Sequence, residues 1–501
     1  MSHNYESEFR SSSSPAGLST GAAPDGAHPL ASRDFRLLFA GRSVSLLGDG
    51  AFLVAMAWQA YTLSNSPTAL SLLGIAMTVP LIALLLFGGV ISDRHDRRRV
   101  MLIADTLRAV LLLALGALAL TGALRLWQMA VIVAIYGGAQ AFFDPASDAI
   151  LPEILPAAQL GSANALEQMV RPLMLRLGGP ALGGVLVAAL GAGGAFVLDG
   201  ASFLLSAATL WAIAPRAAGV GAGGRRRVSA AADLREGWAY VRRRVWLWGT
   251  FASAAIAYLL FMGPAEVLLP FMVKHELGGG AAQLGLVFGA GGLGSVACAA
   301  VMMRSGLPSK GIVFIYATWT LATLAVAFYG VATAVWELMV ASLAFNLLET
   351  AGTIVWATMK QRLVPGALLG RVSSLDWLIS IGLLPVSFAL TAPVSLLVGA
   401  RTTLVVAGVA GAAVTLGGLL LPGMRRGEHE GASSAVQAFL DGPIASVGWT
   451  LLISRSKACG RPGDPEPREP AVAAEGSTTA RRYARGAARD PRAARQTQLH
   501  G

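Results

Sequence analysis

Four ionisable residues stand deep inside long apolar runs, and their chemistry is the first clue to what this chain does. Asp49, Glu266, Glu349 and Arg176 are each flanked by stretches rich in Leu, Ala, Val, Phe and Gly. A charge at the centre of a bilayer costs about 3 kcal/mol on insertion scales, so such a group usually faces a cavity or a partner. We therefore predict that the three carboxylates bind a proton or a cation, and that Arg176 meets an anionic group.

Asp49 is the foremost of these candidates. It lies about 12 residues into its apolar run, which is about 18 Å along a helix and near the middle of a bilayer. A carboxylate at that depth could take up a proton from one side and release it to the other, or hold a cationic substrate. The alternative is a fixed ion pair or a packing hydrogen bond that never titrates. For Asp199, in a later run, we expect a structural role.

The other intramembrane charges have simpler interpretations. Asp105 and Arg108 are three residues apart, so they share one helix face and are expected to neutralise each other. Arg42, Arg171 and Asp376 lie within about two turns of the end of an apolar run, so we expect their side chains to reach the membrane surface.

The composition identifies an integral membrane protein. Of 501 residues, 54% are hydrophobic and 13% are charged, against about 25% charged in ordinary soluble domains. The net charge of +11 resides in loops and in the last segment, without a basic stripe interleaved with aromatic residues, so we expect no nucleic-acid partner. The two cysteines, Cys298 and Cys459, support neither a disulfide framework nor a metal site.

An enzyme or an ATP-driven pump would need residues that this sequence does not arrange for that chemistry. His95 and His275 have no partners at ligand spacing, and the chain has no Gly-x-x-x-x-Gly-Lys-Ser/Thr phosphate loop. We therefore expect no metal, no cofactor and no enzymatic activity.

The apolar runs predict an all-α integral membrane protein with twelve transmembrane helices in two six-helix bundles. The first six spans are expected at 37–63, 69–92, 100–121, 127–143, 163–190 and 194–214. The second six are expected at 246–272, 284–303, 311–331, 335–359, 372–398 and 401–421. The bundles then occupy 35–214 and 246–422, with a disordered cytoplasmic lead at 1–34, a cytoplasmic linker at 215–245 and a disordered cytoplasmic tail at 423–501.

Charge asymmetry places both termini in the cytoplasm. The loop between the second and third spans is dense in arginine, and the loops on its side carry most of the other loop arginines and lysines. The opposite loops carry Arg125, Lys274 and Arg401. Lys and Arg in short loops stay on the cytoplasmic side, so the protein is expected in the cytoplasmic membrane with both ends inside.

The linker contains a further predicted helix at 231–242. Leu234, Trp238 and Val241 fall on one face of it, and arginines cluster at its end. This pattern predicts a helix that lies at the membrane surface.

A short repeat relates the two halves. The segment after the fourth span and the segment after the tenth span share Pro, Leu, Gly and Leu in register, at Pro156/Pro365, Leu160/Leu369, Gly161/Gly370 and Leu166/Leu375. Parallel repeats of six spans are an architecture of transporters that bind their substrate between the halves.

The arginine loop carries the clearest motif. It reads Gly-x-x-x-Asp-Arg-x-x-Arg-Arg, with its defining residues at Gly89, Asp93, Arg94, Arg97 and Arg98. An ordinary positive-inside loop explains the arginines but not the spacing from Gly89 to Asp93. In this position the motif resembles the signature loop of the major facilitator superfamily. The resemblance implies a conformational latch, in which the loop binds helix ends and an acid at the inner end of the fourth span, here Asp144.

The resemblance extends over about residues 35 to 421 and can be narrowed. The segments 35–42, 46–49 and 93–99, together with Phe143-Asp144-Pro145-Ala146, are similar to the branch that contains macrolide-efflux and enterobactin-exporter-like permeases. Known members of that branch export drugs or siderophores, mostly with the proton motive force.

A second motif lies in the fifth span, at Gly179, Pro180, Gly183 and Gly184. Gly-Pro-x-x-Gly-Gly resembles the end of the antiporter signature of drug exporters, although Leu175 occupies the position of the expected upstream glycine. Proline removes a backbone hydrogen bond and glycines allow close approach, so a kinked and tightly packed helix is predicted. A generic small-residue packing seam explains the same residues equally well.

Together these features predict a secondary active transporter that exports small, partly hydrophobic molecules, namely drugs, antibiotics or siderophores, by alternating access with proton antiport. The expected partners are the lipid bilayer, the substrate and protons, and the chain is expected to be a monomer. A lipid flippase or an importer of the same fold is the alternative, and a polytopic membrane enzyme or receptor is less favoured.

Overall fold

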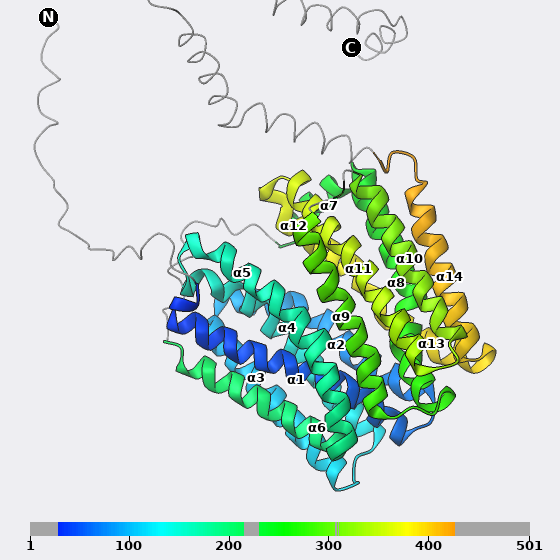
Figure 1. The fold of residues 1–501 in the computed structure, drawn as a ribbon. Coiled ribbons are helices and arrows are strands. Elements are labelled where there is room, and N and C mark those ends of the chain that lie inside the picture. The colour runs from blue at the N-terminus through cyan, green and yellow to red at the C-terminus, as the bar shows by residue number, and fades with distance from the viewer. Residues whose placement is uncertain (1–28, 215–229, 306–307, 309, 426–501) are drawn as a thin grey trace, which may run out of the picture. The chain divides into compact units, whose positions relative to one another are not determined.

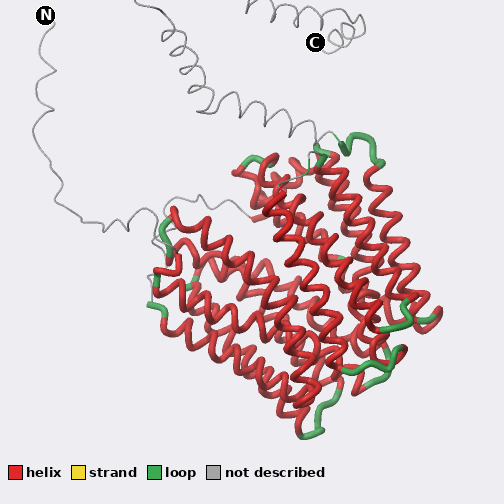
Figure 2. Tube along the Cα trace, in the orientation of Figure 1, coloured by secondary structure: helices red, strands yellow, loops and turns green. Residues whose placement is uncertain are grey.

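The computed structural model describes residues 29–214, 230–305, 308 and 310–425. They belong to one compact unit, Met1–Ala432. Within these ranges the chain forms helices and turns and no strand (Figures 1 and 2). The predicted tail, most of the predicted lead and the first part of the predicted linker lie outside the described residues.

The N-terminal half begins with a short 3-10 turn, Pro29–Ala31, and continues through six apolar segments. Its elements are α1 (Arg33–Leu63), α2 (Pro67–Arg94), α3 (Arg97–Leu120), α4 (Leu126–Ile154), α5 (Ala157–Arg171), the π-helix η2 (Pro172–Gly178) and α6 (Gly179–Ala212). Side chains cap three of the helix starts: Ser32 accepts from the Phe35 amide, Ser66 from the Thr68 amide and Asp96 from the Arg98 amide.

The C-terminal half has the same plan after a linker helix. Its elements are α7 (Ala230–Arg242), α8 (Val245–Phe271), the π-helix η3 (Met272–Glu276), α9 (Ala281–Ser305), α10 (Gly311–Val331), α11 (Val335–Leu363), α12 (Gly366–Gly382), α13 (Leu384–Val398) and α14 (Ala400–Leu419).

The number of membrane spans depends on a break at Gly191. Among the described residues, eleven helical stretches are long and apolar enough to cross a membrane, and one of them runs for 54 residues, Gln159–Ala212. A straight helix of that length would measure about 80 Å, against a hydrocarbon core of about 30 Å. Gly191 has φ 72° and ψ 170°, a backbone conformation that side chains rarely adopt, and it divides this stretch into two spans. The all-helical membrane fold is confirmed, and this break yields the twelve predicted spans.

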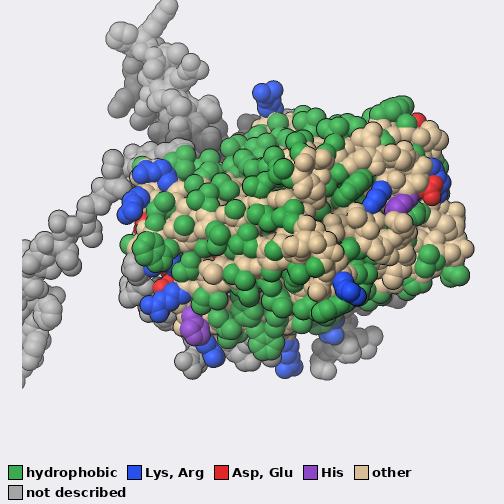
Figure 3. Space-filling model, turned by 90° about the horizontal axis from the view of Figure 1, so that it is seen from below, with side chains coloured by type: hydrophobic (Ala, Val, Ile, Leu, Met, Phe, Trp, Pro, Cys, Tyr) green, Lys and Arg blue, Asp and Glu red, His purple; other side chains and the backbone are tan. Residues whose placement is uncertain are grey.

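The outer surface has the character of a lipid-facing belt. Large apolar side chains are exposed along many helices, among them Leu397 at 85%, Met303 at 78% and Ile103 at 68% of their full area. Figure 3 shows hydrophobic side chains spread over much of one face, with only a few Lys and Arg side chains among them. A soluble protein would rarely expose so much contiguous apolar surface.

The repeat predicted from the sequence appears in the helices. The fourth span, α4, and its counterpart, α11, are both 29 residues long. Each is followed by a proline at the start of the next helix, Pro156 before α5 and Pro365 before α12. At the start of each span a side chain three residues in binds a free backbone amide: Gln128 accepts from Arg125, and Glu337 accepts from Ala334. Glu337 therefore acts as a helix cap.

The two halves touch chiefly away from the arginine loop. The Tyr61 hydroxyl, near the end of α1, donates to the Val267 carbonyl at 2.6 Å, and Lys274 Nζ donates to Thr62 at 3.1 Å. Near the start of α9, Gly285 packs directly on Gly184. In Figure 1 the bundles converge toward the lower right and diverge toward the ends that carry α5 and α12. The arginine loop lies at the diverging end of its half, because it joins α2 to α3.

Candidate functional site

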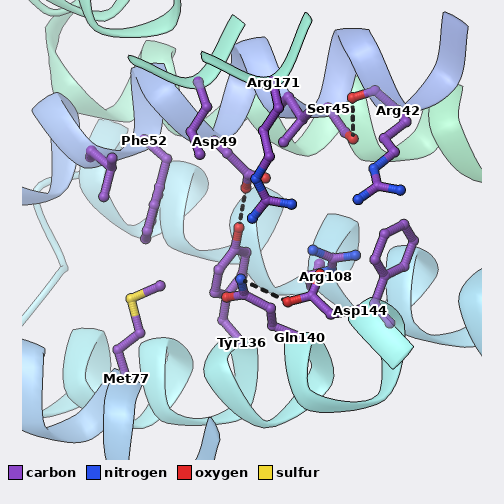
Figure 4. Close-up of a pocket in the computed structure, with 14 residues that line it drawn as sticks. Arg42, Ser45, Asp49, Phe52, Met77, Arg108, Tyr136, Gln140, Asp144 and Arg171 are labelled. Carbon is purple, nitrogen blue, oxygen red and sulfur yellow. Dashed lines mark hydrogen bonds between the residues drawn. The ribbon is translucent and has the colours of Figure 1, made fainter. Parts of the chain in front are cut away.

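A cavity of about 170 Å³ lies inside the N-terminal half, and charged side chains surround it (Figure 4). Helices α1 to α4 and the segment α5–η2 all contribute to its wall. The ionisable and amide residues of the wall are Arg42, Asp49, Arg108, Tyr136, Gln140, Asp144 and Arg171, and its apolar residues include Phe52, Met77 and Phe143. A small space with fixed charges in an apolar bundle is suited to bind a proton or a polar group of a substrate.

Asp49 faces this cavity and has a defined partner. The Tyr136 hydroxyl of α4 donates a hydrogen bond to its Oδ1 atom. The charges that act on the Asp49 carboxylate come from Arg108, Asp144 and Arg171. Burial acts against the Asp49 anion, and the hydrogen-bond donor and the two nearby cations act in its favour. The tyrosine was not singled out in the sequence, where it stands among apolar residues of the fourth span.

Asp105 and Arg108 form the ion pair that their spacing predicted. Arg108 Nη2 donates to Asp105 Oδ1 at 2.5 Å, and both side chains are almost fully buried. The other carboxylate oxygen accepts from the Ser206 hydroxyl at 2.6 Å. The guanidinium also lies over two rings, 4.3 Å from the centroid of Phe143 and 4.4 Å from that of Phe203.

Arg42 and Arg171 do not reach the membrane surface as the sequence suggested. Both side chains point into the cavity in Figure 4. Arg42 Nη1 donates to the Ser147 hydroxyl at 2.5 Å and lies 3.4 Å from the Glu167 carboxylate. An inward partner of opposite charge outweighs solvation at the surface, and Glu167 could not be recognised as that partner because 125 residues separate it from Arg42.

Asp376 differs from its prediction in the same way. It accepts hydrogen bonds from Lys360 and from the Trp356 indole, and its side chain is 13% exposed. Glu167 and Asp376 directly follow the repeat residues Leu166 and Leu375. The two halves therefore hold equivalent acids in polar clusters of the same kind.

Arg176 and Glu349 meet between the two halves. Arg176 belongs to η2 and Glu349 to α11, and Nη1 lies 3.8 Å from Oε2. Arg176 also donates to the Asn346 amide oxygen at 3.4 Å, and Thr353 donates to Glu349 at 3.0 Å. Glu266 on α8 is exposed, and the charge that acts on it is that of Arg176. Arg176 and Glu349 thus meet at the interface, Glu266 is near enough for the charge of Arg176 to act on it, and Asp49 lies in the cavity of the N-terminal half.

A π-helical turn carries Arg176 and directly precedes the motif for which a kink was predicted. Prolines 172 and 180 bracket η2, and the Gly179 amide bonds to the Met174 carbonyl, one residue further back than in an α-helix. Downstream, a side chain on Gly183 would come within 2.7 Å of Ala51 Cα, and one on Gly184 within 2.8 Å of Gly285 Cα. The motif therefore follows a π-helical turn and forms a tight seam, against α1 of its own half and α9 of the other.

The arginine loop binds helix ends, but with a different acid from the predicted one. Arg97 donates to Glu153 in the last turn of α4, and Asp144 lies more than two turns deeper, beside the cavity. Arg98 donates to the carbonyls of Leu210 at 2.7 Å and Trp211 at 2.5 Å, at the end of α6. The last carbonyls of a helix lack intrahelical partners and attract cations.

The other members of the motif are placed less tightly. Arg94 is exposed, and a Cβ atom added to Gly89 would meet no atom within 4 Å. Its neighbour Gly88 instead packs against the Ala141 backbone. The side chain of Asp93 lies outside the described part of the structure. Glu153 could have been suspected from its place at the inner end of the fourth span, but Asp144 fitted the motif better.

The linker helix α7 packs on protein as well as facing outward. Val241 is fully buried beside Trp246, and Glu236 forms an ion pair with Arg371 of α12. Trp238 remains 46% exposed. The predicted apolar face therefore divides, with one residue packed into the C-terminal half and the tryptophan available to the membrane interface.

Two six-helix halves with charged groups within and between them define a membrane transporter of the major facilitator fold. The chain belongs to the transmembrane secretion effector family of that superfamily, whose model matches residues 25–446. The family and the relatives below are transporters, not enzymes.

Three relatives show the range of the family. The uncharacterized MFS-type transporter YfiS of Bacillus subtilis is 26% identical over 55% of this chain and 65% of its own length. The multidrug efflux pump Tap of Mycolicibacterium fortuitum is 31% identical over 44% of this chain and 56% of its own length. Macrolide efflux protein A of Streptococcus pyogenes is 28% identical over 28% of this chain and 34% of its own length. The chain thus spans less than two thirds of each of these proteins, and the predicted resemblance to macrolide-efflux permeases is confirmed at the level of the family.

A solved structure supports the fold. A point mutant of the nucleoside transporter NupG has a TM-score of 0.60 at 11% identity, and the match covers 77% of this chain and 99% of that one. At that identity the likeness shows the arrangement of helices and does not extend to the substrate.

Proposed function

We propose that this protein exports small, partly hydrophobic molecules, such as a drug, antibiotic or siderophore, across the cytoplasmic membrane in exchange for protons. Kinship with efflux pumps supports the direction of transport. The observation that carries the coupling is Asp49, a carboxylate at mid-membrane depth that faces a cavity and accepts a hydrogen bond from Tyr136. Such a group binds a proton when the cavity opens to one side and releases it when access changes.

The test is the substitution Asp49→Asn in purified protein reconstituted into vesicles. We expect the variant to lose substrate accumulation driven by an imposed pH difference and to keep part of its downhill exchange. The wild type, screened with a substrate panel, identifies the compound and the direction of transport. If Asp49→Asn vesicles still build a gradient from the pH difference, Asp49 is not the coupling acid. If intact cells that express the protein take up the compound, the importer would be favoured instead.

The interface residues are proposed to meet the substrate. Two carboxylates, Glu266 and Glu349, share one nearby guanidinium, Arg176. The two carboxylates and the guanidinium together carry a net charge of about −1, which favours a substrate with a cationic group. Tetraphenylphosphonium and tetraphenylborate have nearly the same shape and opposite charge, so we expect the purified protein to bind the cation more tightly, and Glu266→Gln to weaken that preference. Equal binding of both ions would contradict the proposal.

The arginine loop is proposed to act as the latch on the cytoplasmic side, with Asp93, Arg97 and Arg98 as its members and Glu153 as the acid. Its support is the pair of contacts that Arg97 and Arg98 make with the ends of α4 and α6. We expect Asp93→Asn to slow transport while the protein remains inserted and abundant. If Asp93→Asn protein is expressed at the normal level and transports substrate at the wild-type rate, the loop does not act as a latch.

A further inference from the structure

Asp199 is a second buried carboxyl group beside Asp49, and the proposed mechanism does not use it. It lies on α6 and is 1% exposed. Its Oδ1 atom accepts from the Ser202 hydroxyl at 3.1 Å, but that hydroxyl also bonds to the Asp199 carbonyl at 2.7 Å, so the donor is shared. Its Oδ2 atom is buried with no hydrogen-bond partner among the described residues.

The packing of α1 holds this carboxyl group in place. A Cβ atom on Gly48 would overlap both the Asp199 carboxylate and the Ser202 hydroxyl. The absence of a side chain at Gly48 therefore lets Asp199 press against the backbone of the residue that precedes Asp49. The two acids act on each other electrostatically across this seam.

The charged groups around Asp199 come from three helices. Asp49 on α1 repels a second negative charge, and the Tyr136 hydroxyl on α4 donates its hydrogen bond to Asp49 and not to Asp199. Arg108 on α3 is attractive, but it is already paired with Asp105 at 2.5 Å. In the described structure no Lys, Arg or His lies within ion-pair distance of Asp199. A buried carboxylate without a cation or a full set of donors costs several kcal/mol.

We propose that Asp199 is a proton-holding carboxyl group, coupled to Asp49, in this conformation. Neighbouring acids take different protonation states when their environments differ. Asp49 has the tyrosine donor and two arginines, which favour its anion. Asp199 has no tyrosine donor, and the one cation that acts on it, Arg108, is already paired with Asp105, so of the two acids Asp199 is the one that holds the proton. Only the role of the pair in coupling depends on the proposed antiport; the protonation of Asp199 does not.

Infrared spectroscopy of the purified protein in nanodiscs at neutral pH tests this assignment. A protonated carboxyl group gives a carbonyl stretch that is separate from that of carboxylates and shifts in D₂O. We expect this band in the wild type, its loss in Asp199→Asn and its survival in Asp49→Asn. Asp144→Asn, which removes a cavity acid, is the matched control and should retain the band.

Each other outcome overturns the proposal. No such band in the wild type would mean that Asp199 is ionised, and loss of the band in Asp49→Asn alone would place the proton on Asp49. Because the measurement needs no transported substrate, it is independent of the export assay. A protein that fails to couple transport to protons could still show the Asp199 band, and an exporter could lack it.

Discussion

Individual charges inside this bundle are tolerated according to their partners. Asp105 and Arg108 are both buried, but their opposite charges pair at 2.5 Å, and the Ser206 hydroxyl donates to the second oxygen of the acid. Asp199 is equally buried and has an oxygen without a donor in the described structure. Burial alone therefore does not predict what a charge contributes to stability.

The contrast gives a prediction for stability. Removing one partner of a buried ion pair leaves the other charge uncompensated, so Asp105→Asn should lower stability by about 3 kcal/mol. Asp199→Asn removes no ion pair and should leave stability unchanged or raise it, because the neutral amide has the same size. Thermal unfolding of both variants in the same detergent, with wild type alongside, provides the measurement. Equal destabilisation by the two would show that Asp199 is an ionised partner in the fold.

The positions of the intramembrane charges were easier to predict from the sequence than their partners. Depth in an apolar run marked Asp49, Glu266, Glu349 and Arg176, because the cost of a charge in lipid depends on position along one helix. The partners Tyr136, Glu153 and Glu167 come from other helices, and their contacts depend on how helices rotate and pack. Arg176 and Glu349 were each identified, but their contact joins segments that only the folded protein brings together.

Among the helices, α2 carries two adjacent glycines with different surroundings. Gly88 packs against the Ala141 backbone of α4, whereas Gly89 faces open space. Gly89 is about four turns from Gly74, which packs against Phe388 of the C-terminal half. If the halves close at the arginine-loop end during transport, Gly89 is placed to be covered.

We therefore expect Gly88→Leu to reduce thermal stability and yield, because the added side chain meets a backbone. Gly89→Leu should fold as well as wild type and yet lose transport, since the bulk would obstruct closure. Thermal unfolding and vesicle transport, measured on the same two preparations, separate the effects. Full transport by Gly89→Leu would mean that this face stays open throughout the cycle.

The helices were largely predictable, because a run of about 20 apolar residues has few other uses. The fifth and sixth spans were expected as separate segments, and the chain achieves this with a break at Gly191 inside one long helical stretch. The linker helix was found at its predicted place. Its packing on α12 through Glu236 and Arg371 was not, because amphipathic spacing does not distinguish a lipid surface from a protein surface.

For the whole molecule, the position of the contacts between the halves defines which end is closed. Gly184 and Gly285 meet across that contact, at the end of the bundles away from the arginine loop. Alternating access requires this contact to open.

A side chain at this contact should therefore impair the cycle. A Cβ atom on Gly184 would lie 2.8 Å from Gly285 Cα, and one on Gly285 would lie 2.6 Å from Gly184 Cα, so neither Gly184→Leu nor Gly285→Leu can close this contact as the wild type does. We expect both variants to transport substrate into vesicles far more slowly than the wild type, while Gly417→Leu, where an added Cβ atom meets nothing within 4 Å, serves as the control and transports normally. Full transport by Gly184→Leu and Gly285→Leu would show that the cycle does not need the halves to meet there.

The wide turn at η2 has a geometric consequence for the whole fifth span. An extra residue in a helix rotates every later side chain by about 100° relative to an uninterrupted α-helix. Before this turn Glu167 faces Arg42 of its own half, and after it Gly184 faces Gly285 of the other half. The turn thus sets the angle about the helix axis between two surfaces of this helix, one that packs within its own half and one that packs on the other half. Deleting a single residue between Pro172 and Gly178 would rotate the later part of the helix about its axis. Gly184 would then point away from α9, although no residue of the seam itself had changed.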